Sequence, residues 1–227
     1  MQVDIYATKG IEYLLVITYL VLLAVAVKLL SPRLARATRG RGGKRAGRPS
    51  SWFALADGYH FHPAHTWALD GGEDVLTVGL DDFAAQLVGP PDGLELPAVG
   101  TEVRQGERGW QVRAGDRALP MLSPVDGWVV AVNPAVLATP GLAAEDPYGD
   151  GWLLKVESPD RRASLRNLLW GELASAWMRH TAERLRGMPA LGLGVVMPDG
   201  GSPVRGFGRS LGPEEWDAIA REFFRTD

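Results

Sequence analysis

The sequence predicts a mainly β domain with a C-terminal helix, preceded by one transmembrane helix. Short apolar runs at residues 75–80, 128–132 and 152–156 each follow a turn rich in Asp and Gly, which is typical of strands in a β-sandwich or barrel. The 28 glycines and 16 prolines of the 227-residue chain favour many turns and argue against a helical bundle. A 20-residue apolar stretch stands close to the N-terminus.

That apolar stretch, residues 11–30, reads IEYLLVITYLVLLAVAVKLL and is charged only near its ends, at Glu12 and Lys28. Twenty helical residues span about 30 Å, the thickness of one hydrocarbon core. A buried soluble helix and a cleaved signal peptide are the alternatives, and the lack of a basic segment before the apolar run opposes the signal peptide. We therefore expect residues 1–30 to form a short stub and a single membrane span.

The next 20 residues, 31–50, contain seven Lys/Arg and no acid. Such a positive flank stays on the cytoplasmic side of a membrane, and the Gly-rich composition predicts a flexible linker. We expect an inner-membrane protein with its C-terminal part in the cytoplasm and its linker near anionic lipid. Residues 51–227 contain 15 Lys/Arg and 25 Asp/Glu, a formal charge of −10, which does not suit a nucleic-acid partner.

Two helices are predicted in the soluble part before residue 187. Residues 81–87 begin with acids, which favours a short helix whose N-terminus they stabilise. Residues 161–186 have helical periodicity throughout, and we read their arginines as a solvated face rather than a site for an acidic partner. The apolar face of this second helix is predicted to contain Leu165, Leu169, Leu173, Ala176 and Trp177.

A small α+β appendage is predicted over residues 187–227. Residues 191–197 and 202–204 flank a Pro-Asp-Gly-Gly turn, which suggests a hairpin, and residues 213–224 have helical periodicity. The apolar stripe of that helix either docks on the β domain or contacts a partner subunit. Its members are Trp216, Ile219, Phe223 and Phe224.

Several blocks within residues 51–186 are similar to those of a known family. They read YHFHPAHTW from Tyr59, VGLDDFA from Val78, LPAVG from Leu96, SPVDG from Ser123, VNP from Val132 and DPYGDGW from Asp146. In this order they resemble the H-protein of the glycine cleavage system and its H-like relatives. The resemblance implies a flattened lipoyl-type barrel-sandwich with a C-terminal helix.

The resemblance also implies a lysine at the tip of a β-hairpin, to which the family attaches lipoate. Counted back from the SPVDG block, that position falls near Asp116, in a hairpin that includes Arg113, Gly115 and Arg117. The chain has only four lysines, at positions 9, 28, 44 and 155. An arginine cannot replace the lysine, because its guanidinium stays protonated and is not a nucleophile for acylation. We therefore expect no lipoyl group and no other cofactor.

Two patterns could indicate an enzyme. His60, His62 and His65 form the only histidine cluster and could hold a metal, but Pro63 interrupts the strand and the same block belongs to the family resemblance. The second pattern, residues 208–212, reads GRSLG and matches a hydrolase nucleophile elbow, but every histidine precedes Ser210. The absence of cysteine excludes thiol catalysis and cysteine-ligated metal sites. We expect neither a catalytic nor a metal site.

These observations favour a non-enzymatic membrane subunit whose H-like domain has lost its lipoyl lysine. It would act as a structural or docking element in contact with other subunits of a larger membrane complex. We expect that complex to be a respiratory or photosynthetic assembly. An accessory protein of a lipoyl or glycine-cleavage system is the first alternative. A metal-dependent enzyme that uses the histidine cluster is the second. No small-molecule substrate is expected.

Overall fold

The computed structural model describes residues 17–19, 52–188 and 203–225. The chain divides into two compact units, Met1–Gly42 and Gly43–Asp227. In the first unit only residues 17–19 are described, as a piece of helix. The rest of the predicted span, the linker at 31–50 and the apolar run at 191–197 lie outside the described residues. Within the described ranges, no helix has both the length and the apolar character that a membrane crossing needs.

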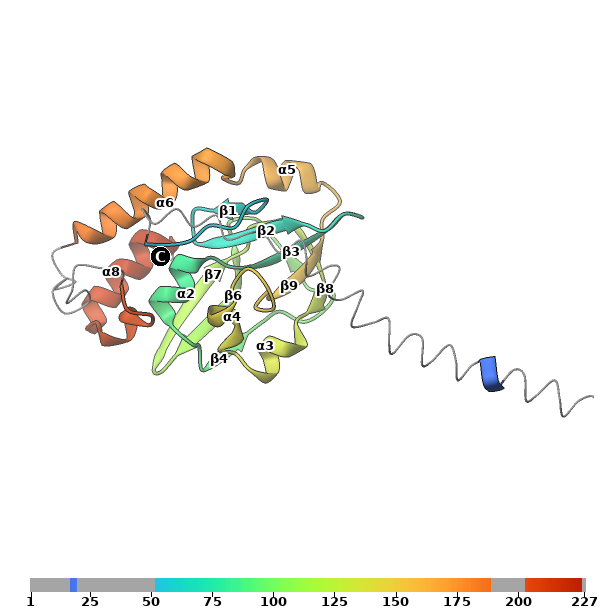
Figure 1. Cartoon of the computed structure of the whole chain (residues 1–227), viewed down its shortest axis with the longest axis horizontal. Helices are drawn as coiled ribbons and strands as arrows, with labels where there is room; N and C mark the ends of the chain where they lie inside the picture. Colours follow the sequence, from blue (N-terminus) through green and yellow to red (C-terminus); the bar gives the residue numbers. More distant parts are fainter. Residues whose placement is uncertain (1–16, 20–51, 189–202, 226–227) are drawn as a thin grey trace, which may run out of the picture. The chain divides into compact units, whose positions relative to one another are not determined.

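The second unit is built from two antiparallel sheets (Figure 1). One has six strands in the order β1-β2-β3-β9-β8-β5, and the other has three in the order β4-β6-β7. The strands are β1 (His60–His62), β2 (Thr66–Asp70), β3 (Val75–Leu80), β4 (Gly93–Glu95), β5 (Glu102–Val103), β6 (Arg108–Ala114), β7 (Arg117–Leu122), β8 (Gly127–Val132) and β9 (Leu154–Glu157). The helices are α2 (Asp82–Val88), α3 (Pro134–Ala138), α4 (Leu142–Glu145), α5 (Arg161–Arg166), α6 (Gly171–Arg186), η2 (Phe207–Ser210) and α8 (Pro213–Phe224).

The three predicted strands are present as β3, β8 and β9, and the mainly β prediction is confirmed. β9 begins two residues later than expected, at Leu154, because Leu153 donates its amide outside the ladder to the carbonyl of Val78. The inward side chains of these strands include Leu76, Val78 and Val156, all fully buried in the main core. Side-chain alternation along each strand therefore directs these residues into the main core, and a second, smaller cluster forms around Phe61 and Trp67.

α2 begins where the acidic pair predicted a helix. Asp81 is its N-cap and accepts a hydrogen bond from the amide of Ala84 at 2.9 Å, which satisfies one free helical N–H. Gly89 ends the helix with a φ of 69°. Nearly every residue of α2 is buried, so this short helix is a core element between the sheets and the C-terminal segment.

The single helix predicted over residues 161–186 is wrong, because the structure has two helices, α5 and α6. Leu169 leaves helical geometry and exchanges two backbone hydrogen bonds with Phe61 of the edge strand β1, of 2.7 and 2.8 Å. This break shifts the helical phase, so that Leu173 is 60% exposed although it was expected on the buried face. The buried side chains of α6 are instead Ala174, Met178, Thr181, Ala182 and Leu185.

α8 covers the side of the domain next to α2 and β7 (Figure 1). The predicted helix over 213–224 is observed with those bounds. Its stripe is buried within this chain, so of the two alternatives the residues dock on the β domain and are not exposed contacts for a partner subunit. The exposed fractions of Trp216, Ile219, Phe223 and Phe224 are 6%, 1%, 3% and 0%. The stripe is therefore part of the core.

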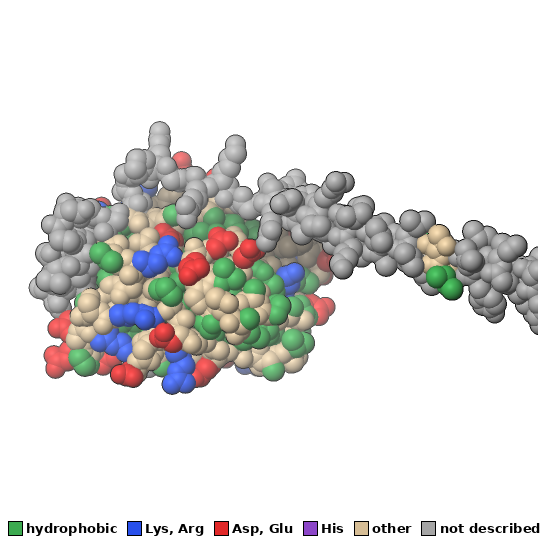
Figure 2. Space-filling view, turned by 60° about the horizontal axis from the view of Figure 1, so that its bottom comes forward, with side chains coloured by type: hydrophobic (Ala, Val, Ile, Leu, Met, Phe, Trp, Pro, Cys, Tyr) green, Lys and Arg blue, Asp and Glu red, His purple; other side chains and the backbone are tan. Residues whose placement is uncertain are grey.

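On the face shown in Figure 2, basic and acidic side chains are interspersed, with hydrophobic side chains between them. No single-sign patch dominates this face.

Candidate functional site

The tip of the β6–β7 hairpin is the position where the sequence suggests a lost modification site. Ala114 pairs with Arg117 in the β6–β7 register, so Gly115 and Asp116 form a two-residue turn. Gly115 has a φ of 61°, which favours glycine in such turns. Asp116 is exposed at the tip, as predicted. Lys155, the only lysine among the described residues, lies within β9 with its ammonium 5.3 Å from the ring centre of Trp152.

The tip is fastened to the loop that precedes β4. The amide of Gly115 donates to Oδ2 of Asp92 at 2.5 Å, and the amide of Asp92 donates to the carbonyl of Arg113 at 2.9 Å. Arg113 also forms an exposed ion pair with Glu95, with 3.1 Å between Nη1 and Oε1. Asp92 was not recognised in the sequence as a site residue, because its partners are more than 20 positions away.

The C-terminal segment contacts the hairpin beside its tip. The guanidinium of Arg117 donates to the carbonyl of Gly208 at 2.6 Å and also to the carbonyl of Leu211. It lies 5.0 Å from the ring centre of Trp216 in α8, within the range of a cation–π interaction. A residue next to the tip is therefore bound by the C-terminal part of the same chain.

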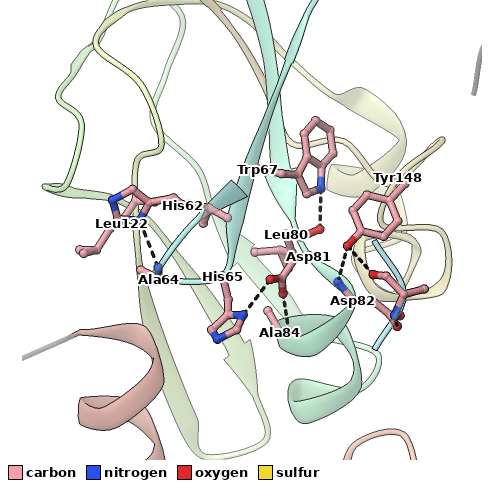
Figure 3. Close-up of polar contacts among 12 residues, drawn as sticks. His62, Ala64, His65, Trp67, Leu80, Asp81, Asp82, Ala84, Leu122 and Tyr148 are labelled. Carbon is pink, nitrogen blue, oxygen red and sulfur yellow. Dashed lines mark hydrogen bonds and ion pairs between the residues drawn. The ribbon is translucent and has the colours of Figure 1, made fainter. Parts of the chain in front are cut away.

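A second group of polar side chains is buried where β1, β2 and α2 meet (Figure 3). Nδ1 of His65 lies 2.7 Å from Oδ2 of Asp81, and both side chains are almost fully inaccessible. The His65 ring stacks between Phe83 and Trp177, with ring centres 4.0 and 4.9 Å away. The pair therefore links the β1–β2 turn, the N-terminus of α2 and the helix α6.

The neighbouring polar contacts connect the same turn to the loop before β9. The Trp67 indole donates to the carbonyls of Leu80 and Pro147 at 2.6 and 3.1 Å. The hydroxyl of Tyr148 donates to the carbonyl of Ala54 at 2.9 Å and accepts from the amide of Asp82 at 3.0 Å. Burial raises the pKa of Tyr148 well above its usual value, so the phenol keeps its proton.

Asp82 is the acidic residue in the hydrogen-bond network that also contains Tyr148. Its Oδ2 accepts from the amide of Ala54 at 2.7 Å and from Nε2 of Gln86 at 2.8 Å. Burial raises the pKa of Asp82, and these two hydrogen bonds oppose the shift. Each polar group in the network has a hydrogen-bond partner within the fold. The arrangement therefore describes a structural network, with no nucleophile placed beside a base.

The three histidines do not form a metal site. Within the described ranges, no group of three or more His, Asp or Glu side chains is placed to bind a metal ion. His65 is committed to Asp81, and Nδ1 of His62 accepts a hydrogen bond from the amide of Ala64 at 3.1 Å. Burial lowers the pKa of His60, whose ring faces Trp170. Pro63 begins the turn, residues 63–65, that lies between His62 and the second strand.

The hydrolase-like GRSLG pattern also has no catalytic geometry. It follows Gly206 in a 3-10 turn rather than at a strand-to-helix elbow, and the hydroxyl of Ser210 donates to the carbonyl of Phe207 at 2.8 Å. Its first glycine instead allows close packing, because a Cβ on Gly208 would lie 2.7 Å from both the carbonyl oxygen of Leu87 and the ring of Trp216. The pattern is explained by docking on α2.

Two antiparallel sheets with an exposed two-residue hairpin tip define the class as a β-sandwich domain with a protruding hairpin. Residues 59–181, just over half of the chain, match the model of the family described as "Glycine cleavage H-protein". The chain therefore belongs to the glycine cleavage H-protein family. The matched region ends within α6, so the C-terminal segment that contacts the hairpin lies beyond it.

Several curated relatives are glycine cleavage system H proteins of mycobacteria. The protein of Mycobacterium sp. strain KMS is 37% identical over 112 residues, which are 48% of this chain and 86% of that protein. The protein of Mycobacterium avium strain 104 is 36% identical over 104 residues, or 46% and 79% of the two chains. A crystal structure of the H protein of Mycobacterium marinum aligns with 26% identity and a TM-score of 0.47, covering 59% of this chain and all of that one.

Proposed function

We propose that this chain is a non-enzymatic, single-pass membrane subunit whose H-protein-like domain carries no lipoate. The domain serves as a structural or docking element on the cytoplasmic side of a larger membrane complex. The observation that carries the proposal is the hairpin tip, where Asp116 occupies the position at which the family resemblance implies a lysine. A carboxylate cannot form an amide with the carboxyl group of lipoate.

The residues present do not fit a lipoyl group elsewhere in the described domain. Lys155 is within a strand that pairs with both β3 and β8, and its side chain lies against Trp152 rather than at a protruding tip. A swinging carrier group needs a tip position, because a strand residue is held against its neighbours on both sides. We therefore derive no group-transfer step through this domain.

The membrane part of the proposal rests on sequence alone. Residues 11–30 have the length and apolarity of a span, and the seven positive charges of residues 31–50 favour a cytoplasmic domain. A tether of this kind raises the local concentration of a docking domain near membrane partners without adding specificity.

Lipoylation tests the first part of the proposal. The purified chain is incubated with lipoate–protein ligase, lipoic acid and ATP, and its intact mass is measured. We expect no adduct on the wild type and one lipoyl group on Asp116→Lys, because the tip is exposed and the turn is retained. Glu107→Lys, which places a lysine in another exposed turn, is the matched control and should stay unmodified. A lipoyl adduct on the wild type, at Lys155 or any other lysine, would refute the proposal.

Membrane attachment and partner identity are tested together. The full chain should remain in washed membranes at high pH, whereas a variant lacking residues 1–30 should be released. Extraction in mild detergent should then recover the full chain with integral membrane subunits. Release of the full chain by the same wash would contradict the tether.

The alternative function, an accessory of a lipoyl or glycine-cleavage system, is supported by the family membership itself. An H-protein-like surface without the modified lysine could still dock on enzymes that bind H proteins. Recovery of such enzymes with the detergent-extracted chain, in place of membrane subunits, would favour this alternative.

A further inference from the structure

The C-terminal segment, residues 203–225, is bound both to the β6–β7 hairpin and to the end of α2. From the hairpin, Arg117 donates to the carbonyls of Gly208 and Leu211. From the segment, Arg209 donates to the carbonyls of Val88, at 3.1 Å, and of Pro90. Two arginines that reach in opposite directions thus join parts of the chain more than 90 positions apart.

Arg209 also connects the segment to the hairpin tip through one carboxylate. Its Nη2 lies 3.4 Å from Oδ2 of Asp92, and the same oxygen accepts the amide of Gly115 at 2.5 Å. Asp92 is 57% exposed and Arg209 is 41% exposed, so the ion pair by itself contributes little. The bonds to backbone carbonyls and the apolar contacts must therefore supply most of the attachment.

The apolar contacts are close because glycines remove side chains at the interface. The amide of Gly206 donates to the carbonyl of Gln86 at 2.6 Å, which brings the segment against the backbone of α2. A Cβ on Gly89 would lie 2.8 Å from Cα of Gly206. Phe207 and Trp216 then fill the space between α2 and β7, with exposed fractions of 4% and 6%. The complementarity indicates a permanent contact rather than a transient one.

We propose that residues 203–225 form a built-in clamp on the hairpin. The clamp holds the tip, β7 and α2 as one rigid unit and occupies the flank of β7 that would otherwise be open to another protein. Arg117 and Arg209 are its positioning residues. The clamp lies beyond the region matched by the family, so it is a property of this chain's own extension.

The role of the clamp rests on the proposed function. A docking element must present a fixed surface, and the clamp would keep the hairpin in one position. The clamp closes the β7 flank of the hairpin, whereas Arg113 and Asp116 stay exposed.

Hydrogen exchange measured by mass spectrometry on the full chain in detergent tests the clamp. The variants are Gly208→Ala, which adds a methyl group against Leu87 and Trp216 without backbone strain, and Arg117→Gln. We expect peptides covering residues 108–122 to exchange at least tenfold faster in both variants. Peptides covering residues 60–80 should stay within twofold of the wild type.

Two matched controls separate the clamp from general loosening. Gly187→Ala adds a methyl group where the nearest atoms are at an ordinary 3.6 Å, and Arg161→Gln removes an ion-paired arginine on another part of the domain. Neither should alter exchange in the hairpin. Hairpin exchange that is unchanged in both clamp variants, or accelerated equally over the whole domain, would overturn the clamp. Lipoylation of the wild type would instead overturn the proposed function and leave the exchange result standing.

Discussion

Asp81→Ala is expected to lower the free energy of unfolding by about 4 kcal/mol, because it removes two interactions of one fully buried carboxylate. Oδ2 is the partner of His65, and Oδ1 caps α2 through the amide of Ala84. Loss of an N-cap costs about 1 kcal/mol, and leaving the buried imidazole without its hydrogen-bond partner costs about 3 kcal/mol. Urea unfolding of the domain measures the change.

Two further variants separate these contributions. Asp160→Ala removes an exposed N-cap, that of α5, and should cost only about 1 kcal/mol. Asp81→Asn keeps one acceptor oxygen, enough to cap α2, and replaces the other oxygen by an NH2 donor, so it should cost less than Asp81→Ala. If Asp81→Ala destabilises the domain no more than Asp160→Ala does, the contact between His65 and Asp81 contributes nothing to stability.

The local features of this domain could be predicted from the sequence. The apolar runs and Asp-Gly turns indicated β3, β8 and β9, and the acids at Asp81 and Asp82 indicated the start of α2. The hairpin tip was placed at Asp116 by its distance from the SPVDG block. The strands and the start of α2 depend on residues within about ten positions of one another, so sequence periodicity and turn chemistry were sufficient for them, whereas the tip was located through the family resemblance.

The contacts that define the site depend on residues far apart in the chain. Arg117 and Leu211 are 94 positions apart, and nothing in the GRSLG pattern indicates that Gly208 fits against α2. The break between α5 and α6 was missed because Leu169 has the right spacing for a helix while its backbone pairs with Phe61. Tertiary pairing overrode helical periodicity at that point.

The stability of the domain is expected to fall by about 2 kcal/mol between pH 7.5 and pH 5 through His62 alone. Burial lowers the pKa of His62 from 6.5 to about 4, and the positive charge of Arg225 adds to the shift. In the unfolded chain His62 takes up a proton as the pH falls through about 6.5. The folded state cannot do so until about pH 4, so acid favours the unfolded state between these values.

Two other groups titrate near this range, and a matched variant isolates His62 from them. The lowered pKa of His60 acts in the same direction, whereas the raised pKa of Asp82 opposes it, because folded Asp82 holds its proton to higher pH than the unfolded chain does. His62→Asn retains an acceptor for the Ala64 amide but cannot titrate. Urea unfolding at both pH values should therefore show a loss about 2 kcal/mol smaller in His62→Asn than in the wild type. Equal losses in the two proteins would show that His62 is protonated in the folded domain as readily as in the unfolded chain.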